Sequence, residues 1–388
     1  MYVILICIVL AVVAAIRLQD TENKFEKAEK ALYVAVALFF VVRFSIGQDT
    51  GTYHWLFYGV TNPFADSLTS HMMRNPLFTL CNYGIKILFH EFRWFVLCSN
   101  LFILGSFTWV IFHRSKHLAM SLFLFCASGM LEVYYGSGLR QGAVMAIFIF
   151  AFYQFLPKKR YLLYELFCLI AAGFHETGLL LMAVPLLVPA AKKFKDKPVK
   201  VTVILFAVSA VICLITTLGF EKLGYFLIDT YGWDPTWTHV IAYLRYQEFS
   251  IMGLGMEGVF LIGILLLYYL ADKTQLDDFT NLEMMTFLFS IALYISLAGY
   301  SLMSRCSDMF QVIMVVLVPK LIGAIPQKSR KVTAFGAVAV LNLFLLYTDL
   351  SVKTASVSAN ESFQFTLKNF PYITVFDADT INSLYEPH

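Results

Sequence analysis

Long apolar runs recur along the whole of this 388-residue chain, and short segments rich in lysine and arginine separate them. A helix needs about 20 consecutive apolar residues to cross the hydrocarbon core of a bilayer. No water satisfies the backbone there, so each run has to fold as a helix that satisfies its own hydrogen bonds. The runs that fit this template lie near residues 2–16, 31–46, 92–112, 118–136, 141–157, 161–175, 177–191, 201–219, 252–271, 284–303, 309–325 and 332–349.

These runs predict an all-α polytopic integral membrane protein with about 11–13 transmembrane helices, some of them short or re-entrant. The pair 161–175 and 177–191 is short, so it forms either two tilted spans or a re-entrant hairpin with His175 at its tip. A further helix over 77–90, with polar residues on its apolar face, is expected to lie flat on the membrane. Because no repeat or linker divides the chain, we expect one transmembrane domain over residues 1–388.

Composition agrees with a membrane protein and excludes several other classes. The chain is 59% hydrophobic and only 14% charged, whereas a soluble domain carries about 25% charged residues. Its net charge is +3 and it has no lysine or arginine block, so we expect no nucleic-acid partner. The seven cysteines are scattered, and no histidine, cysteine and carboxylate cluster has the spacing of a zinc site. The sequence therefore predicts no metal site.

The basic residues predict an orientation, because lysine and arginine collect on the cytoplasmic side of membrane proteins. They cluster near residues 17–30, 114–116, 158–160, 192–200 and 320–331. The opposite side then holds external loops over 47–76 and 220–251 and an external tail over 350–388. Every isolated charge at the edge of a span also falls on this external side, although the orientation follows from the basic loops alone. We therefore expect a functional site that faces the exterior.

The first group of such charges follows the second apolar run, in Arg43-Phe-Ser-Ile-Gly47-Gln-Asp49. A charge held at this depth is expensive and usually marks function. Arg43 is a candidate cation for an anionic ligand, and Asp49 is a candidate base or the partner that orients the arginine. The structural alternative is a local salt bridge that ends the span, with Arg43 reaching toward the headgroups.

The second group is Gly136-Ser-Gly138-Leu-Arg140-Gln141, at a break between two spans. The glycines permit a tight turn, which places Arg140 near the N-terminus of the next helix. Helix N-termini favour anions, and an arginine fork binds phosphate oxygens in a bidentate manner. The alternative is an arginine that only anchors the helix at the membrane interface.

Two more groups occupy similar positions. His175 and Glu176 interrupt an apolar stretch, and a histidine can act as a general base near neutral pH. The alternative for His175 is a buried residue with satisfied hydrogen bonds. Arg305 ends a late run on the same side and is either an anchor or a third arginine of an anion clamp.

In this order along the chain, the motifs resemble the EpsG family, which comprises Wzy-type polymerases for exopolysaccharide and O-antigen repeat units. The resemblance rests on Arg-x-x-x-Gly-x-Asp-x-x-x-Tyr from Arg43 to Tyr53, Leu139-Arg140-Gln141 before an alanine-rich helix, Phe174-His175, the late Arg305 and Pro371-Tyr372. Asn75 stands before Pro76 where the family pattern predicts a glutamate. Asp49 is then the acidic candidate of the first external loop.

The resemblance implies a GT-C-like membrane glycosyltransferase of the bacterial cytoplasmic (inner) membrane, with its active site facing the periplasm or exterior. Such an enzyme transfers a growing glycan from polyprenyl diphosphate to an acceptor repeat unit on the same lipid. It serves O-antigen, capsule or exopolysaccharide biosynthesis and needs no metal or cofactor. Its partners would be polyprenyl-diphosphate-linked oligosaccharides and membrane lipid, with a chain-length regulator protein as a further candidate.

This chemistry assigns roles to the candidate residues. Cations stabilise the leaving diphosphate, and a carboxylate or histidine accepts the proton of the acceptor hydroxyl. The first candidate for the base is His175 and the second is Asp49, with Glu176 as a further catalytic candidate. The candidates for binding diphosphate or sugar are Arg43, Arg140, Arg305, Tyr53, Gln141 and Tyr372.

Two other functions stay open. About a dozen spans with intramembrane charges would also suit a flippase or transporter of lipid-linked oligosaccharides, in which the arginines bind diphosphate without catalysis. Against this, the polar groups lie at one face, and no repeat divides the chain into two halves. The second alternative is an O-antigen ligase-like glycosyltransferase, which uses a similar donor but a different acceptor.

Overall fold

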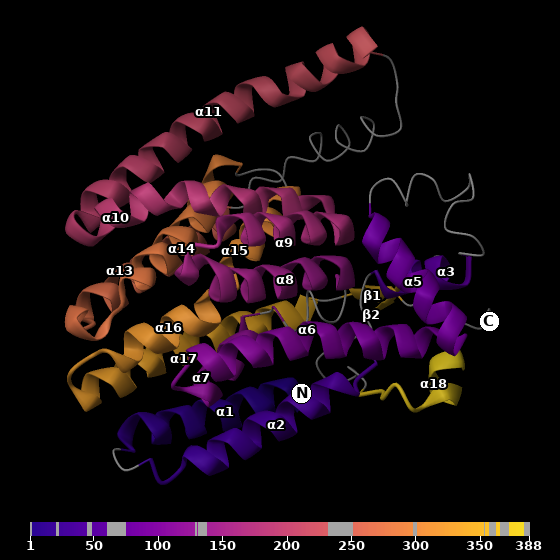
Figure 1. Cartoon of the computed structure of the whole chain (residues 1–388), viewed down its shortest axis with the longest axis horizontal. Helices are drawn as coiled ribbons and strands as arrows, with labels where there is room; N and C mark the ends of the chain where they lie inside the picture. Colours follow the sequence, from indigo (N-terminus) through magenta and orange to yellow (C-terminus); the bar gives the residue numbers. More distant parts are fainter. Residues whose placement is uncertain are drawn as a thin grey trace. The chain divides into compact units, whose positions relative to one another are not determined.

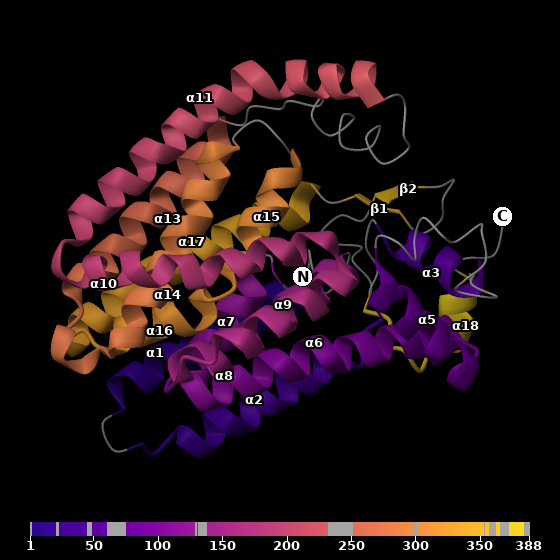
Figure 2. The same cartoon turned by 45° about the horizontal axis from the view of Figure 1, so that its top comes forward.

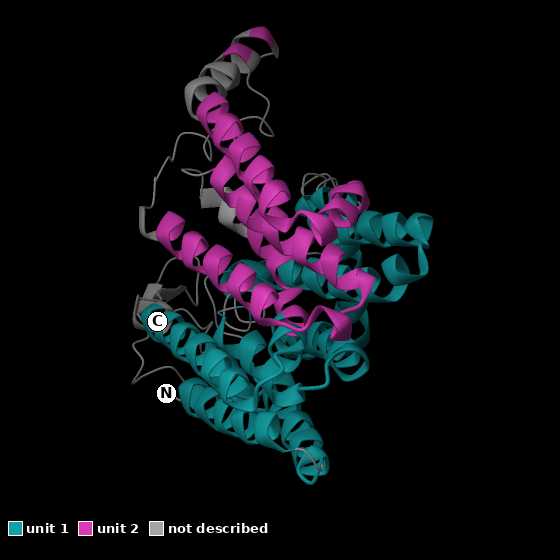
Figure 3. Ribbon diagram, turned by 90° about the vertical axis from the view of Figure 1, so that its left-hand side faces the viewer, with its two compact units in different colours: residues 1–182, 318–388 teal, residues 183–317 magenta. Residues whose placement is uncertain are grey.

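The computed structural model describes residues 2–20, 23–44, 49–59, 75–128, 130, 138–231, 251–297, 301–352, 354–356, 362–364 and 372–383. It is built of helices, with one pair of short strands near the C-terminus (Figure 1). The chain divides into two compact units, which Figure 3 distinguishes by colour. Unit 1 comprises residues 1–182 and 318–388, and unit 2 comprises residues 183–317. Each unit is described by itself.

Unit 1 contains most of the helices that carry the predicted site. Its elements are α1 (Tyr2–Gln19), α2 (Glu26–Val41), α3 (Thr50–Gly59), α5 (Pro76–Phe89), α6 (Phe92–Arg114), α7 (Leu118–Ala127), α8 (Leu139–Phe155), η3 (Leu156–Lys158), α9 (Tyr161–Phe174), α17 (Lys328–Val352), β1 (Thr354–Ser356), β2 (Ser362–Gln364) and α18 (Ala378–Ser383). The 3₁₀ helix η4 (Glu176–Leu187) and the helix α16 (Met314–Gly323) continue across the boundaries between the units.

Within the described residues, eight helices are long and apolar enough to cross a membrane. They are Tyr2–Gln19, Phe92–Arg114, Leu139–Lys158, Glu176–Asp196, Pro198–Thr216, Gly253–Leu270, Asp278–Ser296 and Lys328–Thr348. Four shorter apolar helices accompany them, at Pro76–Phe89, Leu118–Ala127, Tyr161–Phe174 and Met314–Gly323. The predicted fold class, an all-α polytopic membrane protein, is confirmed. The total of 11–13 crossings stays a prediction.

Several predicted boundaries need correction. In the run 118–136, α7 ends at Ala127, and residues 129 and 131–136 lie outside the described residues. The run 284–303 begins inside a helix that spans Asp278–Ser296. Arg305 therefore does not end that span but lies in the following helix, Ser301–Gln311. Hydropathy misplaced these ends because it registers apolar side chains and not the turns between them. The predicted turn at His175 is confirmed, since α9 ends at Phe174 and His175 is extended.

The short helix α7 forms the centre of one part of unit 1. All ten of its residues are buried, and it packs against α1, α2 and α17. In Figures 1 and 2, α1 and α2 lie side by side next to it. A helix that is apolar all round needs no polar surroundings, so α7 can be enclosed by its neighbours.

Basic turns gather at one end of unit 1. The Arg17 guanidinium donates from Nε to Glu29 Oε2 at 2.9 Å, and the other Glu29 oxygen accepts the Ala119 backbone N–H at 2.8 Å. This carboxylate therefore satisfies the start of α7 as well as the arginine. Arg114 donates to the Tyr153 carbonyl at the end of α8. The predicted cytoplasmic turns of this unit are thus close to one another.

The C-terminal tail returns to the other end of α2. The Phe44 N–H donates to the Ile373 carbonyl at 2.7 Å, and the Val375 N–H donates to the Val42 carbonyl at 2.9 Å. The Asn100 amide, from α6, donates to the carbonyls of Val41 and Arg43 at 3.0 and 2.8 Å. Because these carbonyls end a helix, Asn100 and the tail provide the partners that the helix itself cannot.

Unit 2 is a bundle around α14 (Asp278–Ser296), most of whose side chains are buried. The helices packed against it are α10 (Val188–Asp196), α11 (Pro198–Tyr231), α13 (Ile251–Leu270) and α15 (Ser301–Gln311), and the 3₁₀ helix η5 (Lys273–Gln275) precedes it. Asp277 begins α14, because its carboxylate accepts the Thr280 N–H at 2.9 Å. The predicted external loop over 220–251 needs correction at its start, because α11 continues as a helix to Tyr231. From 232 to 250 this loop lies outside the described residues.

Gly178 fixes the turn between α9 and η4. Its N–H donates to the His175 carbonyl at 2.9 Å, and a Cβ added here would overlap the backbone of Ala171 and Ala172. A backbone contact cannot be relieved by a change of side-chain rotamer. The close approach therefore requires glycine at this position.

We expect Gly178→Ala to lower the free energy of unfolding by about 1–3 kcal/mol, the range for overpacking in a close-packed interior. The measurement is the thermal unfolding midpoint of the purified protein in detergent. Gly84→Ala is the matched control, because Gly84 lies in α5 with no atom within 4 Å of an added Cβ. Equal midpoints for the two variants would contradict the close packing at Gly178.

Candidate functional site

Arg140 lies in the first turn of α8, at the opposite end of that helix from Tyr153 and the basic turns. Gly138 is the residue that precedes the helix. The Arg140 guanidinium carbon lies 5.7 Å from the centre of the Tyr53 ring and 5.9 Å from the centre of the Phe78 ring. Aromatic faces attract a cation and shield it from water, typically with about 0.5–2 kcal/mol. The two rings therefore hold the charge in place at the helix N-terminus.

Asn75 connects Arg140 to the end of α9. Its amide is assigned in the orientation that satisfies both neighbours. In that orientation Nδ2 donates to the Phe174 carbonyl at 3.1 Å, and Oδ1 accepts from Arg140 Nη1 at 3.1 Å. Asn75 also precedes Pro76 at the start of α5 and is only 7% exposed. One buried amide thus links the ends of α5, α8 and α9.

Arg140 retains hydrogen-bonding capacity beyond this contact. Within the described part of the chain, its Nε is buried and has no hydrogen-bond partner. In the same part of the chain, no carboxylate forms an ion pair with it. A half-buried guanidinium that is held by neutral groups and keeps one buried donor unused is a ready site for an anion.

Tyr53 contributes its ring and its hydroxyl to this group. The side chain is 1% exposed, and burial raises the pKa of its phenol while the nearby Arg140 acts in the opposite direction. The phenol is therefore a neutral donor near pH 7. His54, the next residue of α3, is also neutral there, because burial lowers its pKa to about 4. The positive charge at this site thus comes from Arg140 and not from His54.

His175 follows Phe174 directly, so it lies one residue from the carbonyl that Asn75 binds. Its Nδ1 is 2.8 Å from Thr177 Oγ1 and accepts the Thr177 N–H at 3.3 Å. A ring nitrogen that accepts a hydrogen bond carries no proton, so the neutral ring has its proton on Nε2. This tautomer makes Nε2 a hydrogen-bond donor.

The other acidic candidates differ in exposure. Asp49 is half-buried, and its carbonyl accepts the Tyr53 N–H at 3.0 Å, which places it at the start of α3. Its negative charge is close enough to Tyr53 to act on the phenol. Glu176 is exposed. Gln141, a neutral candidate for binding sugar or diphosphate, is buried and follows Arg140 in α8. Asp49 is therefore the carboxylate that the structure brings to the Tyr53 and Arg140 group.

Arg43 and Tyr372 belong to a second group. Arg43 is 1% exposed, and its guanidinium carbon lies 5.7 Å from the centre of the Tyr2 ring. The Tyr372 hydroxyl donates to the Phe39 carbonyl at 2.8 Å, and its ring stacks on Phe39 with centroids 4.3 Å apart. The hydroxyl proton of Tyr372 therefore serves to hold the tail on α2. Binding of sugar or phosphate by Arg43 and Tyr372 stays a prediction.

Arg305 lies on α15 in unit 2, and its side chain is outside the described residues. The structure brings Tyr53 to Arg140 directly, and Asn75 joins Arg140 to Phe174, the residue before His175. A clamp in which Arg305 joins Arg140 stays a prediction.

Asn75 and Phe78 are the members of the site that the sequence did not single out as ligands. In the sequence, Asn75 is notable only because it departs from the family pattern, and Phe78 is one of 37 phenylalanines. One signal was available for Asn75: a polar residue directly before a proline marks the start of a helix. The Asn75 side chain does not cap α5, however, and bonds Phe174 and Arg140 instead. No signal in the sequence distinguishes Phe78, because its contact with Arg140 is tertiary.

The architecture and this site define a class: a multi-pass α-helical membrane protein with a half-buried arginine, packed against aromatic rings, at one end of a span. The family model of the EpsG family matches residues 31–372, which is most of the chain. The protein therefore belongs to the EpsG family, as the motifs suggested. Neither a curated protein nor a solved structure matches this chain.

We expect Asn75→Ala to loosen the turn at His175, because the Phe174 carbonyl loses its donor and Arg140 loses its acceptor. Leaving such groups unpaired typically costs about 1–3 kcal/mol. The measurement is hydrogen–deuterium exchange of peptides covering residues 174–178, which should become faster. Thr79→Ala is the control, since it removes a bond to the Asn75 backbone but leaves the amide bridge intact. Unchanged exchange in Asn75→Ala would show that the bridge does not hold this turn.

Proposed function

We propose that this protein is a Wzy-type polymerase that joins lipid-linked oligosaccharide repeat units. The observation that supports this function best is the half-buried Arg140, with a buried and unused Nε donor among the described residues and no ion-paired carboxylate there. A glycan polymerase needs such a group because its leaving group is a lipid diphosphate. Membership of the EpsG family supports the same class of reaction.

The reaction places most of its charge on the leaving group. An acceptor hydroxyl attacks the anomeric carbon of the donor glycan, the bond from that carbon to the diphosphate oxygen breaks, and polyprenyl diphosphate leaves. Negative charge grows on the diphosphate in the transition state, and a fixed guanidinium stabilises it without reorganisation. Held by two rings and one amide, Arg140 is oriented before substrate arrives. Arg305 and Arg43 are the further cations that we propose for this role.

The acceptor hydroxyl must lose a proton as it attacks. We propose Asp49 as the base, because it is the carboxylate that lies at the start of α3 and close to Tyr53. His175 then donates from Nε2 to a phosphate or sugar oxygen, as its contacts with Thr177 favour. His175 as the base is the alternative, and it requires the other tautomer.

We place this chemistry at the outer face of the bacterial cytoplasmic membrane. In unit 1, the turns that carry Arg17 and Arg114 lie at one end of the helices. Arg140 lies at the start of α8, about 20 Å from its end at 1.5 Å per residue. The positive-inside rule then favours an external Arg140.

We expect Arg140→Ala to lower polymerisation by roughly 100- to 1,000-fold, as for loss of an oxyanion-binding group. Arg140→Lys should lose roughly 10- to 100-fold, because a lysine cannot both bond Asn75 and bind phosphate oxygens in a bidentate manner. The assay uses purified protein, a synthetic polyprenyl-diphosphate-linked repeat unit and EDTA, with the glycan ladder read on a gel. Arg160→Ala, an exposed arginine in the turn before α9, is the control.

Two outcomes of that assay would overturn the proposal. A wild-type protein that makes no ladder from its cognate unit, yet moves the lipid across liposomes, is a flippase. Transfer to a non-repeat acceptor only would identify a ligase-like enzyme. A ladder that disappears with EDTA would overturn metal independence alone.

We expect His175→Gln to retain at least about a tenth of the wild-type rate, because the glutamine amide can donate from nearly the position of Nε2. His175→Asn and His175→Ala should lose more, since neither places a donor there. If His175 is the base, the glutamine and alanine variants should be equally inactive. His113→Gln, at an exposed position in the last turn of α6, is the control.

A further inference from the structure

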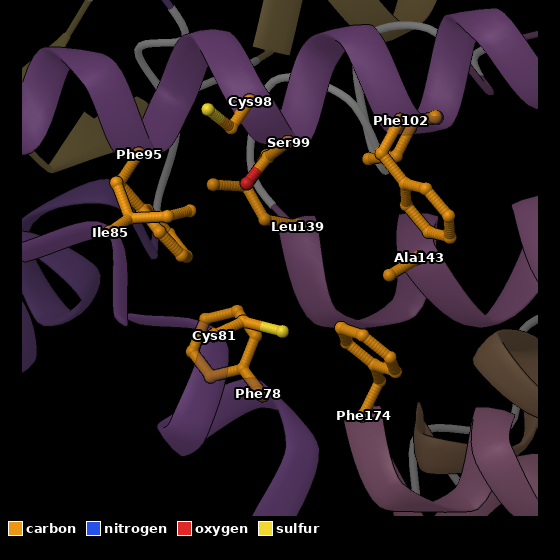
Figure 4. Close-up of a pocket in the computed structure, with 11 residues that line it drawn as sticks. Phe78, Cys81, Ile85, Phe95, Cys98, Ser99, Phe102, Leu139, Ala143 and Phe174 are labelled. Carbon is orange, nitrogen blue, oxygen red and sulfur yellow. The ribbon is translucent and has the colours of Figure 1, made fainter. Parts of the chain in front are cut away.

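An apolar hollow of about 270 Å³ lies beside the arginine site in unit 1. Four helices surround it: α5, α6, α8 and α9. Figure 4 shows Phe102 and Phe174 on one side and Phe95 and Ile85 on the other. Phe102 and Phe174 are stacked with their centroids 6.2 Å apart. Apart from the Ser99 hydroxyl, the side chains of the described residues that line it offer only carbon and sulfur.

The chemistry of these walls restricts the occupant. A sugar or another polar group placed here would lose its hydrogen bonds with water and find few replacements. A hydrocarbon loses nothing of this kind and gains the contacts of the aromatic rings. The volume is slightly below that of a site for a whole drug-sized ligand, so the hollow suits part of a longer hydrocarbon chain.

Phe78 joins the hollow to the cation. Its ring is part of the wall and also lies 5.9 Å from the Arg140 guanidinium carbon. Leu139 and Ala143, which flank Arg140 on α8, line the same hollow. The occupant therefore has a negative charge directly beside its hydrocarbon. A phospholipid does not fit this description well, because polar glycerol and ester groups separate its phosphate from its acyl chains. A prenyl diphosphate does, because its hydrocarbon begins at the phosphate oxygen.

The hollow is also reachable from lipid. Phe102, which lines it, is 43% exposed on the candidate span α6, and its neighbour Leu101 is 50% exposed. Large apolar side chains exposed on a membrane span face hydrocarbon. Cys81 of α5 lines the hollow and is exposed as well. A lipid tail can therefore enter sideways from the bilayer.

We infer that this hollow binds the first isoprene units of a lipid diphosphate whose phosphates pair with Arg140. The identity of the ligand rests on the proposed function, whereas the position of its tail rests on the hollow and on Phe78. Binding of the tail in this hollow would fix the orientation of the substrate. With the tail between α5, α6, α8 and α9, the diphosphate lies at Arg140, and the glycan extends from the far end of the diphosphate.

The test is photo-crosslinking, which needs no turnover. The probe is a short prenyl diphosphate with a diazirine on its first isoprene unit, added to the full-length protein in nanodiscs. Labelled peptides mapped by mass spectrometry should come from α5 and α6. An unlabelled prenyl diphosphate should compete, and a straight-chain alkyl diphosphate should compete about tenfold less well.

Ser99→Trp fills the hollow and should reduce this labelling by about tenfold or more. Leu101→Trp, on the lipid-facing side of the same helix, is the matched control and should label like the wild type. Labelling outside the hollow, or labelling that Ser99→Trp leaves unchanged, would overturn the inference. So would equal competition by the straight chain. If Ser99→Trp fails to fold, the labelled peptides of the wild-type protein alone test whether the tail lies in the hollow.

Failure of this inference and failure of the proposed function give different results. Labelling in the hollow without a glycan ladder would support the tail site and contradict the polymerase function. A glycan ladder with labelling outside the hollow would support the polymerase function and contradict the tail site.

Discussion

The hydrogen bonds of one buried amide hold the candidate site together. Phe174 is the last residue of α9, so no further turn of that helix can donate to its carbonyl. Arg140 lies in the first turn of α8, and its guanidinium needs a hydrogen-bond acceptor. Asn75 serves both at 3.1 Å. A side chain with a donor and an acceptor on one planar group is suited to this task, and an apolar residue would leave both partners unsatisfied in a dry environment. The relative positions of Arg140 and His175 thus depend on Asn75.

The same requirement, that buried polar groups find partners inside the protein, explains the other polar residues of unit 1. Glu29 is 1% exposed and satisfies both Arg17 and the start of α7. Asn100 is 0% exposed in the middle of a candidate span and satisfies two carbonyls at the end of α2. In each case the buried side chain bonds backbone groups at a helix terminus, because the last carbonyls and first N–H groups of a helix lack partners within it. Arg140 differs, since it keeps an unused donor among the described residues.

The sequence was informative where the pattern is local. Apolar run length located most spans, and the end of a run followed by His175 located the turn that α9 makes there. The glycine before Leu139 located Arg140 at a helix start. Contacts between distant segments were not accessible in this way. The stacking of Tyr372 on Phe39, and the place of Phe78 beneath Arg140, depend on how helices pack, and many other aromatic residues in the chain look the same in one dimension.

The neutrality of Asn75 bears directly on what Arg140 can bind. The family pattern led us to expect a glutamate at this position, and a carboxylate at Oδ1 would form an ion pair with the guanidinium. An ion pair in a low-dielectric site is strong, so an incoming diphosphate would have to displace it or share the arginine with it. The amide instead orients the guanidinium by one hydrogen bond and leaves its charge available. With an apolar hollow on one side of Arg140 and the Tyr53 hydroxyl near the same arginine, the polarity along the site changes from hydrocarbon to cation to a hydrogen-bonding group. A lipid-linked glycan has the same order of parts, from tail to diphosphate to sugar, so the site and this class of substrate match along their length.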